Sequence, residues 1–161
     1  MELKSLSLED FRNYGGARLE FDSRCNVICG ENAQGKTNLL EAIVCLAAGK
    51  SHRTRSDREL VRFGREGFQL EGATAARGRM FTSRIEYGYG RRKRIAINQV
   101  PAKAASELSQ VLNTIFFCPE DLQLIREGAA ARRRFMDLSL CQLRPRYAAA
   151  LAEYQRLHEH K

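Results

Sequence analysis

The stretch VICGENAQGKTNLLEAI, from Val27 to Ile43, decides the fold. A short apolar segment ends at Gly30, a glycine-containing loop follows, and an apolar run begins after Thr37. Positions 30–37 fit the pattern G-x-x-x-x-G-K-[S/T] without a mismatch. This pattern, placed between a strand and a helix, is typical of a loop that cradles phosphate groups.

Each fixed position of the loop has a mechanical reason. Gly30 and Gly35 let the backbone bend tightly, so that N–H groups point inward and bind an anion. A helix that begins near Lys36 adds the positive end of its dipole. Lys36 reaches the β- and γ-phosphates, and the Thr37 hydroxyl ligates Mg²⁺. The sequence therefore predicts a purine nucleotide, ATP, with Mg²⁺, bound by Gly30, Glu31, Asn32, Ala33, Gln34, Gly35, Lys36 and Thr37.

The segments beside the loop support this prediction. CNVIC, from Cys25 to Cys29, is short, apolar and β-branched, which favours a buried strand. Residues 38–48 are apolar almost all round, with Glu41 as their only charge, which favours a buried helix. Gly49 can end that helix with a left-handed cap.

Other segments show the two-residue alternation of strands. Leu3–Leu8 and Ala17–Phe21 are strand-like runs, with turn signals between them at Asn13, Gly15 and Gly16. Residues 79–88 alternate and are followed by RIAIN, which predicts an antiparallel hairpin with Arg91, Arg92, Lys93 and Arg94 near its turn. Residues 114–117 are a further candidate for a buried strand.

The rest of the chain favours helix. A helix is predicted from Pro101, and another over residues 119–128, where proline and acids begin the segment and glycine ends it. Two more are predicted over residues 129–143 and 144–161, and the last has no stop signal. The predicted division is an ATP-binding lobe, residues 1–127, and the beginning of a helical lobe, residues 128–161.

Composition limits the compartment and the partners. No apolar stretch reaches the length of a membrane span, and the first residues lack the pattern of a signal peptide, so we expect a cytoplasmic protein. The five cysteines match no zinc pattern. The net charge is +8, and its excess lies in residues 50–94, with 13 Lys or Arg against 5 Asp or Glu. Such asymmetry suggests nucleic acid, or a solvated basic surface, and we expect Arg91, Arg92, Lys93 and Arg94 to be the DNA-binding residues if the partner is DNA.

The residues that would hydrolyse a nucleotide are not found in this sequence. An ATPase of this class needs an acid at the end of an apolar strand, and in TIFFCPED the proline interrupts the strand before Glu120 and Asp121. LSLCQ, from Leu138 to Gln142, lacks the glycines of the ABC signature L-S-G-G-Q. We therefore expect no catalytic residue in this chain and little or no turnover.

Four blocks carry a resemblance to a known family. FRNY at residues 11–14, GENAQGKTNLLEAI at 30–43, KSHRT at 50–54 and FFCPEDLQLIREG…RRRFMD at 116–137 together resemble RecF, a family of bacterial DNA replication and repair proteins in the SMC-like branch of the ABC ATPases. The last block is more particular than the phosphate loop, which many families share.

The resemblance implies an α/β fold of the P-loop NTPase class, like an ABC or SMC head: a mixed β-sheet around the P-loop helix, with antiparallel strands, then the start of a helical lobe. It implies weak ATP hydrolysis by the full-length protein, an ATP-dependent homodimer and ATP-dependent DNA binding. It also implies partnership with RecR and RecO in loading RecA at gapped DNA, in replication, repair, recombination and the SOS response.

By position, the resemblance puts Arg12 and Asn13 beside the nucleotide, although Arg12 is also acceptable as a solvated turn residue. Pro119, Glu120 and Asp121 take the place of the loop that senses the γ-phosphate, without its usual glutamine. Chains of the family continue well beyond Lys161, so the resemblance implies a fragment or a truncated product.

Two alternatives remain at this point. One is another SMC-like or ABC ATPase without a DNA role. The other is a P-loop kinase, in which the basic stretch would be a lid of arginines, although its hairpin pattern disfavours a helical lid.

Overall fold

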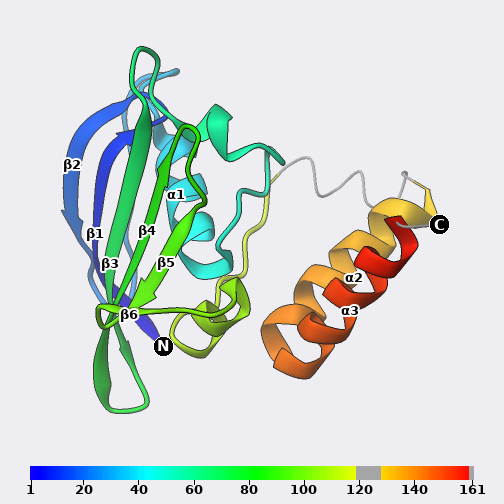
Figure 1. The fold of residues 1–161 in the computed structure, drawn as a ribbon. Coiled ribbons are helices and arrows are strands. Elements are labelled where there is room, and N and C mark those ends of the chain that lie inside the picture. Colours follow the sequence, from blue (N-terminus) through cyan, green and yellow to red (C-terminus); the bar gives the residue numbers. More distant parts are fainter. Residues whose placement is uncertain (119–127, 160–161) are drawn as a thin grey trace. The chain divides into compact units, whose positions relative to one another are not determined.

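The computed structural model describes residues 1–118 and 128–159 (Figure 1). The chain divides into two compact units, Met1–Thr114, called unit 1, and Ile115–Lys161, called unit 2. Unit 1 contains a six-stranded sheet and the helix that follows the phosphate loop, and unit 2 contains two helices.

The sheet of unit 1 has the strand order β2-β1-β3-β4-β5-β6. Every pairing in it is antiparallel, so the described residues contribute an antiparallel sheet where a mixed one was predicted. The central strand is β3, which the sequence analysis did not identify. The strands are β1 (Glu2–Phe11), β2 (Tyr14–Glu20), β3 (Gly67–Ala76), β4 (Arg79–Gly88), β5 (Arg94–Ile97) and β6 (Val100–Pro101).

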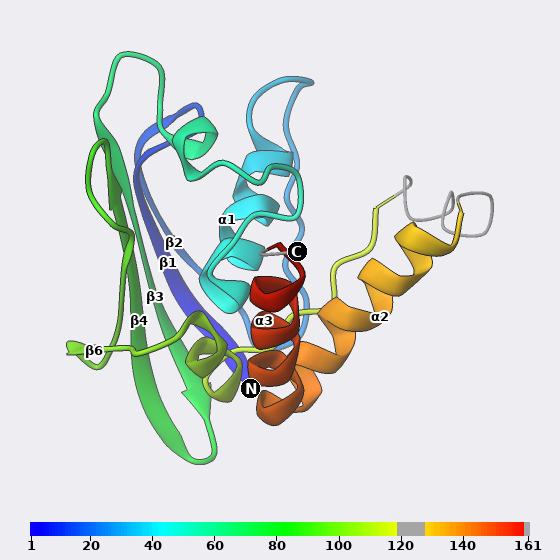
Figure 2. The same ribbon diagram turned by 45° about the vertical axis from the view of Figure 1, so that its right-hand side comes forward.

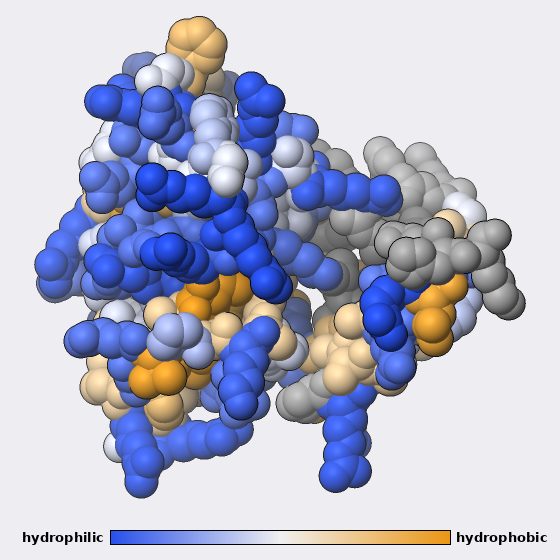
Figure 3. Space-filling view, in the orientation of Figure 1, coloured by the Kyte–Doolittle hydropathy of each residue, from blue (hydrophilic) through white to orange (hydrophobic). Residues whose placement is uncertain are grey.

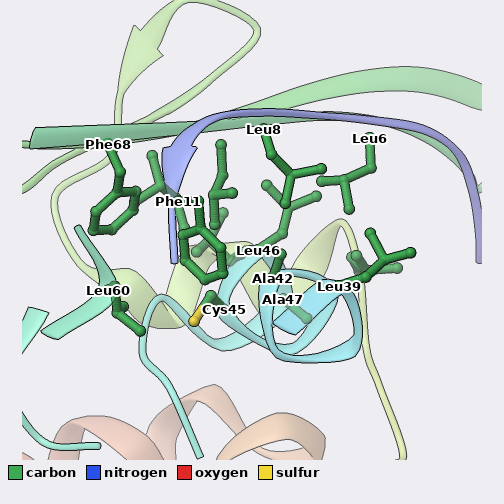
Figure 4. Close-up of a cluster of buried hydrophobic side chains, with 14 of the residues drawn as sticks. Leu6, Leu8, Phe11, Leu39, Ala42, Cys45, Leu46, Ala47, Leu60 and Phe68 are labelled. Carbon is green, nitrogen blue, oxygen red and sulfur yellow. The ribbon is translucent and has the colours of Figure 1, made fainter. Parts of the chain in front are cut away.

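Helix α1 (Lys36–Ala48) lies against one face of this sheet (Figure 2). Strand residues alternate between the two faces, so that Leu6 and Leu8 of β1 point toward the helix while Ser7 does not become buried (Figure 4). Helix residues such as Leu39 and Leu46 meet them and complete one apolar core. The predicted helix is confirmed, and so is its end, because Gly49 has φ +70° and donates its N–H to Cys45.

The first two predicted strands are confirmed and pair as a hairpin, and the predicted β4–β5 hairpin is confirmed as well. On β4, Ser83 and Ile85 face the core, as the alternation requires. The first turn is formed by residues 12 and 13, however, while Gly15 and Gly16 belong to β2. Glycine is permissive at a turn and equally acceptable in an edge strand, so its presence alone did not fix the turn.

Two predicted buried strands are wrong. Residues 25–29 form no strand, and Val27 is 82% exposed. Residues 114–117 form none either, and Ile115 is fully exposed. In the described part of the chain neither segment takes part in the strand pairing of the sheet, and an apolar run that joins no sheet is not a strand.

Two short 3-10 helices complete unit 1, η1 (Asp57–Leu60) and η2 (Ala105–Gln110). The helix predicted from Pro101 is therefore shorter, since Pro101 itself ends β6. Leu60 and Leu108, one from each short helix, are fully buried and extend the core around α1.

Unit 2 consists of α2 (Ala129–Leu143) and α3 (Pro145–Glu159), which form a helical hairpin (Figure 1). The Tyr147 hydroxyl donates a hydrogen bond to the Asp137 carboxylate and links the two helices, and this bond raises the pKa of Tyr147. Residues 138–142 lie within α2, which confirms that LSLCQ is helical. No helix among the described residues is long and apolar enough to span a membrane.

Candidate nucleotide-binding site

The phosphate loop has the backbone that an anion site requires. Three of its residues have positive φ values: Gly30 at +151°, Ala33 at +65° and Gly35 at +105°. Left-handed residues among right-handed ones turn successive N–H groups toward one side of the chain and form a concave donor surface. Glycine takes these angles at little cost, which is why the pattern fixes positions 30 and 35.

The N-terminus of α1 has no side-chain cap. Gly35 is the N-cap residue, no acid lies in the first turn, and the first backbone bond runs from Leu39 N–H to Gly35 O at 2.9 Å. The N–H groups at the start of a helix have no acceptor within the helix. Because no side chain neutralises them, they and the helix dipole remain available to a phosphate.

Lys36 closes the loop across its two ends. Its Nζ donates to the carbonyl oxygens of Gly30, at 2.7 Å, and of Glu31, at 2.6 Å. An ammonium group has three donors, so one remains for a phosphate oxygen. The neighbouring Thr37 is exposed at the surface, where its hydroxyl can reach a metal ion bound with the phosphates.

The β1–β2 turn packs directly on the loop through Asn13. Asn13 Nδ2 donates to the Gln34 carbonyl at 3.2 Å, and Asn38 Nδ2 donates to Asn13 Oδ1 at 2.8 Å. The Tyr14 hydroxyl donates to the Gly35 carbonyl at 3.2 Å. A Cβ at position 35 would lie 2.6 Å from Asn13 Nδ2, so this close approach requires glycine. The structure thus brings Asn13 to the loop, while its place beside a nucleotide stays a prediction.

Arg12 has a different environment from that of Asn13. Its guanidinium donates to both carboxylate oxygens of Glu41, at 2.9 and 2.8 Å, and to the Glu59 carbonyl at 2.8 Å. Two parallel bonds from one guanidinium to one carboxylate fix both side chains. In this structure Arg12 therefore joins the turn to the middle of α1, and its role beside a nucleotide stays a prediction.

Glu41 is fully buried and carries the centre of this network. Besides Arg12, it accepts hydrogen bonds from the Ser51 hydroxyl and from Arg53 Nη1, the latter at 3.0 Å. Burial works to raise its pKa, but the hydrogen bonds and the charges of the two arginines outweigh burial and hold the pKa below its ordinary value. The carboxylate thus stays charged and ties α1 to residues 51–53.

A protein-family model described as an AAA domain matches residues 5–115. This chain belongs to the AAA domain family. It is also similar to proteins called DNA replication and repair protein RecF. It is 42% identical to that of Agathobacter rectalis over 97% of this chain and 43% of the relative, and 42% identical to that of Listeria innocua over 98% and 42%. The resemblance read from the four blocks is confirmed.

Solved structures agree with the family assignment. A structure of the recombination mediator protein RecF with ATP has a TM-score of 0.91 and 35% identity, over 96% of this chain and 42% of that one. A structure described under ATP-driven dimerisation and DNA-stimulated activation of SMC ATPases has a TM-score of 0.68 at 18% identity, which shows the fold alone. The P-loop NTPase fold class is confirmed. This chain spans about 43% of the length of the curated RecF relative that it matches.

The basic turn of this AAA domain divides its four cations. Lys93 is turned inward, where its Nζ donates to the Gly49 carbonyl at 2.8 Å and pairs with Asp57 at 2.7 Å. It therefore holds the C-terminus of α1, where a cation is favourable. Arg91, Arg92 and Arg94 are exposed and have no ion-pair partner within the described ranges, so these three remain as candidates for DNA.

The predicted γ-phosphate sensors lie outside the described residues, and the fold of the basic stretch weakens the kinase alternative. Glu120 and Asp121, the predicted sensors of the γ-phosphate, lie outside the described residues. The basic stretch, residues 50–94, folds into η1, β3 and β4 with their loops. It therefore offers no helical lid, and no observation favours the kinase alternative.

Glu41 is the one charge of an otherwise apolar helix, and no role was predicted for it from the sequence. That isolation was itself the signal, since a lone carboxylate on a buried helix face must have a cationic partner. The partners were not readable from the sequence, because Arg12 lies 29 residues away from Glu41. Only the packing of the first hairpin on α1 brings them together.

Proposed function

We propose that this chain is the ATP-binding lobe of a RecF-type DNA repair ATPase, with the triphosphate of ATP held by residues 30–37. What supports this most directly is the uncapped N-terminus of α1 beside a loop with three left-handed residues. Relatives named for DNA replication and repair, and a related structure that contains ATP, give independent support.

The residues have separate tasks in binding. The N–H groups of the loop and of the first turn of α1 bind the phosphate oxygens, and Lys36 adds a charge-assisted bond. The Thr37 hydroxyl is the protein ligand proposed for Mg²⁺, which neutralises phosphate charge when bound. Asn13, already bonded to Gln34, fixes the loop from outside, and we propose that Arg12 and Asn13 together border the nucleotide.

The wider activity follows from the family and from the charge. We propose ATP-dependent homodimerisation, binding to DNA through Arg91, Arg92 and Arg94, and work with RecR and RecO in loading RecA at gapped DNA. The cytoplasm, replication, recombination and the SOS response are the proposed setting. The support is the basic excess of residues 50–94 and the names of the relatives.

The division into lobes and the residues that sense the γ-phosphate are also proposals. We propose an ATP-binding lobe over residues 1–127 and the start of a helical lobe over 128–161. Glu120 and Asp121 are proposed to sense the γ-phosphate. The resemblance to RecF supports weak ATPase activity for the full-length protein, and the lack of a catalytic acid in this chain supports little turnover by the chain alone.

The first test is Lys36→Ala. Removing the ammonium takes away a charge-assisted bond to phosphate, so we expect ATP with Mg²⁺ to bind at least about tenfold more weakly in a calorimetric titration. Lys50→Ala is the matched control, because Lys50 is exposed beyond the other end of α1. Equal affinities for the wild type and the Lys36→Ala variant would rule out nucleotide binding at this loop.

A further inference from the structure

Two loops lie side by side at one end of unit 1. The first, residues 62–66, precedes β3, and the second, residues 89–93, joins β4 to β5 (Figure 1). Tyr89 N–H donates to the Glu66 carbonyl at 2.8 Å, and Gly67 pairs with Gly88 where the two strands meet. The two loops are more than 20 residues apart in the sequence, so the surface that they form together could not be predicted from either loop.

The first loop holds an aromatic side chain out in solvent. Phe63 is fully exposed, at 102% of its reference area. The turn that presents it is ordered, since Arg65 N–H donates to the Arg62 carbonyl at 3.0 Å and Gly64 has φ +77°. Arg62 and Arg65 also lie 3.7 and 3.3 Å from Asp10, which fixes the base of the loop.

The second loop adds a supported aromatic ring. Tyr89 is 42% exposed, and the guanidinium of Arg58 lies 5.1 Å from the centre of its ring. Behind it, Tyr87 lies 6.3 Å from Tyr89 and 5.8 Å from Phe68, so a chain of rings leads back to the core. A ring supported in this way is fixed in position before a partner arrives.

The cations around these rings define the partner. Arg91, Arg92 and Arg94 follow Tyr89 in the chain, are exposed, and have no ion-pair partner in the described part of the chain. Figure 3 shows hydrophilic side chains crowding this end of unit 1, with an apolar group projecting from it. A single exposed aromatic residue is ordinary on a protein surface. Exposed rings among unpaired arginines are the combination that binds single-stranded nucleic acid, because bases stack and phosphates pair.

We propose that Phe63 and Tyr89 form a stacking platform for unpaired bases of single-stranded DNA, while Arg91, Arg92 and Arg94 bind its phosphates. This inference rests on the proposed DNA-binding function and deepens it. The arginines serve single and double strands alike, whereas the rings serve only bases that are free to leave the stack. Phe63 is therefore a residue that selects the single-stranded part of a gap.

The test uses the whole protein and measures the affinity for a labelled single strand and for a duplex of the same length over a range of salt concentrations. Phe63→Ala should bind the single strand roughly tenfold more weakly and the duplex as before. The slope of log K against log salt should stay unchanged, because no charge is lost. Since Phe63 contacts nothing in the fold, its removal should not affect stability.

Three further variants make the result decisive. Phe63→Trp should restore single-strand binding, since indole stacks as well as phenyl. Met80→Ala, which truncates another exposed apolar residue at the opposite end of β4, should change nothing. Arg91→Ala with Arg92→Ala should weaken both DNA forms and reduce the salt slope by about 0.7 per lost contact on the single strand.

The outcomes separate this inference from the function on which it rests. If Phe63→Ala binds the single strand as the wild type does, or loses single strand and duplex equally, the platform is wrong. If the arginine variant still binds DNA more weakly in that case, the proposed DNA-binding function stands although the stacking platform is wrong. A wild type that binds neither form would remove both, and an acidic protein segment would then be the better partner for this surface.

Discussion

At the scale of the residue, Glu41 is the buried centre of the hydrogen-bond network beside the site. Its carboxylate is fully buried and is bound by Arg12, Ser51 and Arg53. Replacing a buried carboxylate leaves its cationic partners without a counter-charge, which costs more than the net worth of the pair. Arg12 comes from the first hairpin, and Ser51 and Arg53 come from the segment after α1, so one side chain holds the hairpin, α1 and residues 51–53 together.

Glu41→Gln is expected to lower the free energy of unfolding by about 2 kcal/mol or more at neutral pH, measured by chemical denaturation. The variant keeps the size of the side chain, so the loss reports charge and hydrogen bonding rather than a cavity. Glu31→Gln, at an exposed loop position, is the control and should leave unfolding unchanged. An unchanged Glu41→Gln variant would mean that the network adds nothing to stability.

The pH dependence of stability also reports whether the charged carboxylate of Glu41 stabilises the fold. The pKa of Glu41 is lower in the folded state than its ordinary value of 4.5. Its contribution is therefore present above pH 4.5 and is lost as the pH falls through the folded-state pKa. We expect the gap in unfolding free energy between wild type and Glu41→Gln to narrow on acidification. A gap that stays constant would show that the pKa of Glu41 does not change on folding.

At the scale of the element, Lys93 stabilises the end of α1 and does so from a loop that the sequence assigned to DNA. Its ammonium lies on the Gly49 carbonyl and on Asp57, and both side chains of the ion pair are about three quarters shielded from solvent. A cation at a helix C-terminus contributes about 0.3–1 kcal/mol, and more when partly buried. We therefore propose two different roles for the four consecutive cations of the turn.

Lys93→Ala is expected to cost about 1 kcal/mol of stability without reducing the salt slope of DNA binding. Arg92→Ala should do the opposite, because Arg92 is exposed and pairs with no described residue. Thermal unfolding and DNA titration of the two variants give the comparison. If Lys93→Ala lost a phosphate contact and kept its stability, Lys93 would belong to the DNA surface.

The elements also show what could be predicted from the sequence. The phosphate loop, α1 and the β4–β5 hairpin were predictable because each depends on local pattern. Strand β3 was not, since Gly72, Ala73 and Ala75 are small and give a weak strand signal, although β3 pairs with both β1 and β4. Conversely, apolar residues 25–29 suggested a strand, but a strand needs a neighbour, and its neighbour is a property of the fold. The pairing of Arg12 with Glu41 and the meeting of the two aromatic loops were unpredictable for the same reason.

At the scale of the whole molecule, both candidate sites of unit 1 lie at one end of its sheet. The first turn ends β1 where Phe11 pairs with Tyr14, and Gly67 and Gly88 pair at the same end of β3 and β4. Asn13 of this turn bonds the phosphate loop, and Asp10 pairs with the arginines that flank Phe63. One hairpin turn therefore contacts both the proposed nucleotide site and the proposed DNA surface.

The accessibility of the cysteine thiols can test whether the core of unit 1 stays packed as one unit. Cys45 is buried in the centre of the core (Figure 4). Burial, together with the charge of Glu41, raises its pKa to about 12, so almost none of it is thiolate at neutral pH. Cys25 and Cys29 are exposed. We expect an alkylating reagent to modify Cys25 and Cys29 rapidly in the native protein, and Cys45 only at denaturant concentrations that unfold unit 1.

Peptide mass mapping assigns each modification to its cysteine, and circular dichroism of the same samples reports unfolding. Because Cys45 packs against residues from both β1 and α1, its protection requires the sheet and helix to stay together. Its rate of modification should therefore rise along the same denaturant curve as the loss of helix. Rapid native modification of Cys45 would show that α1 separates from the sheet while the rest of unit 1 stays folded. That outcome would contradict the single apolar core on which the phosphate loop is built.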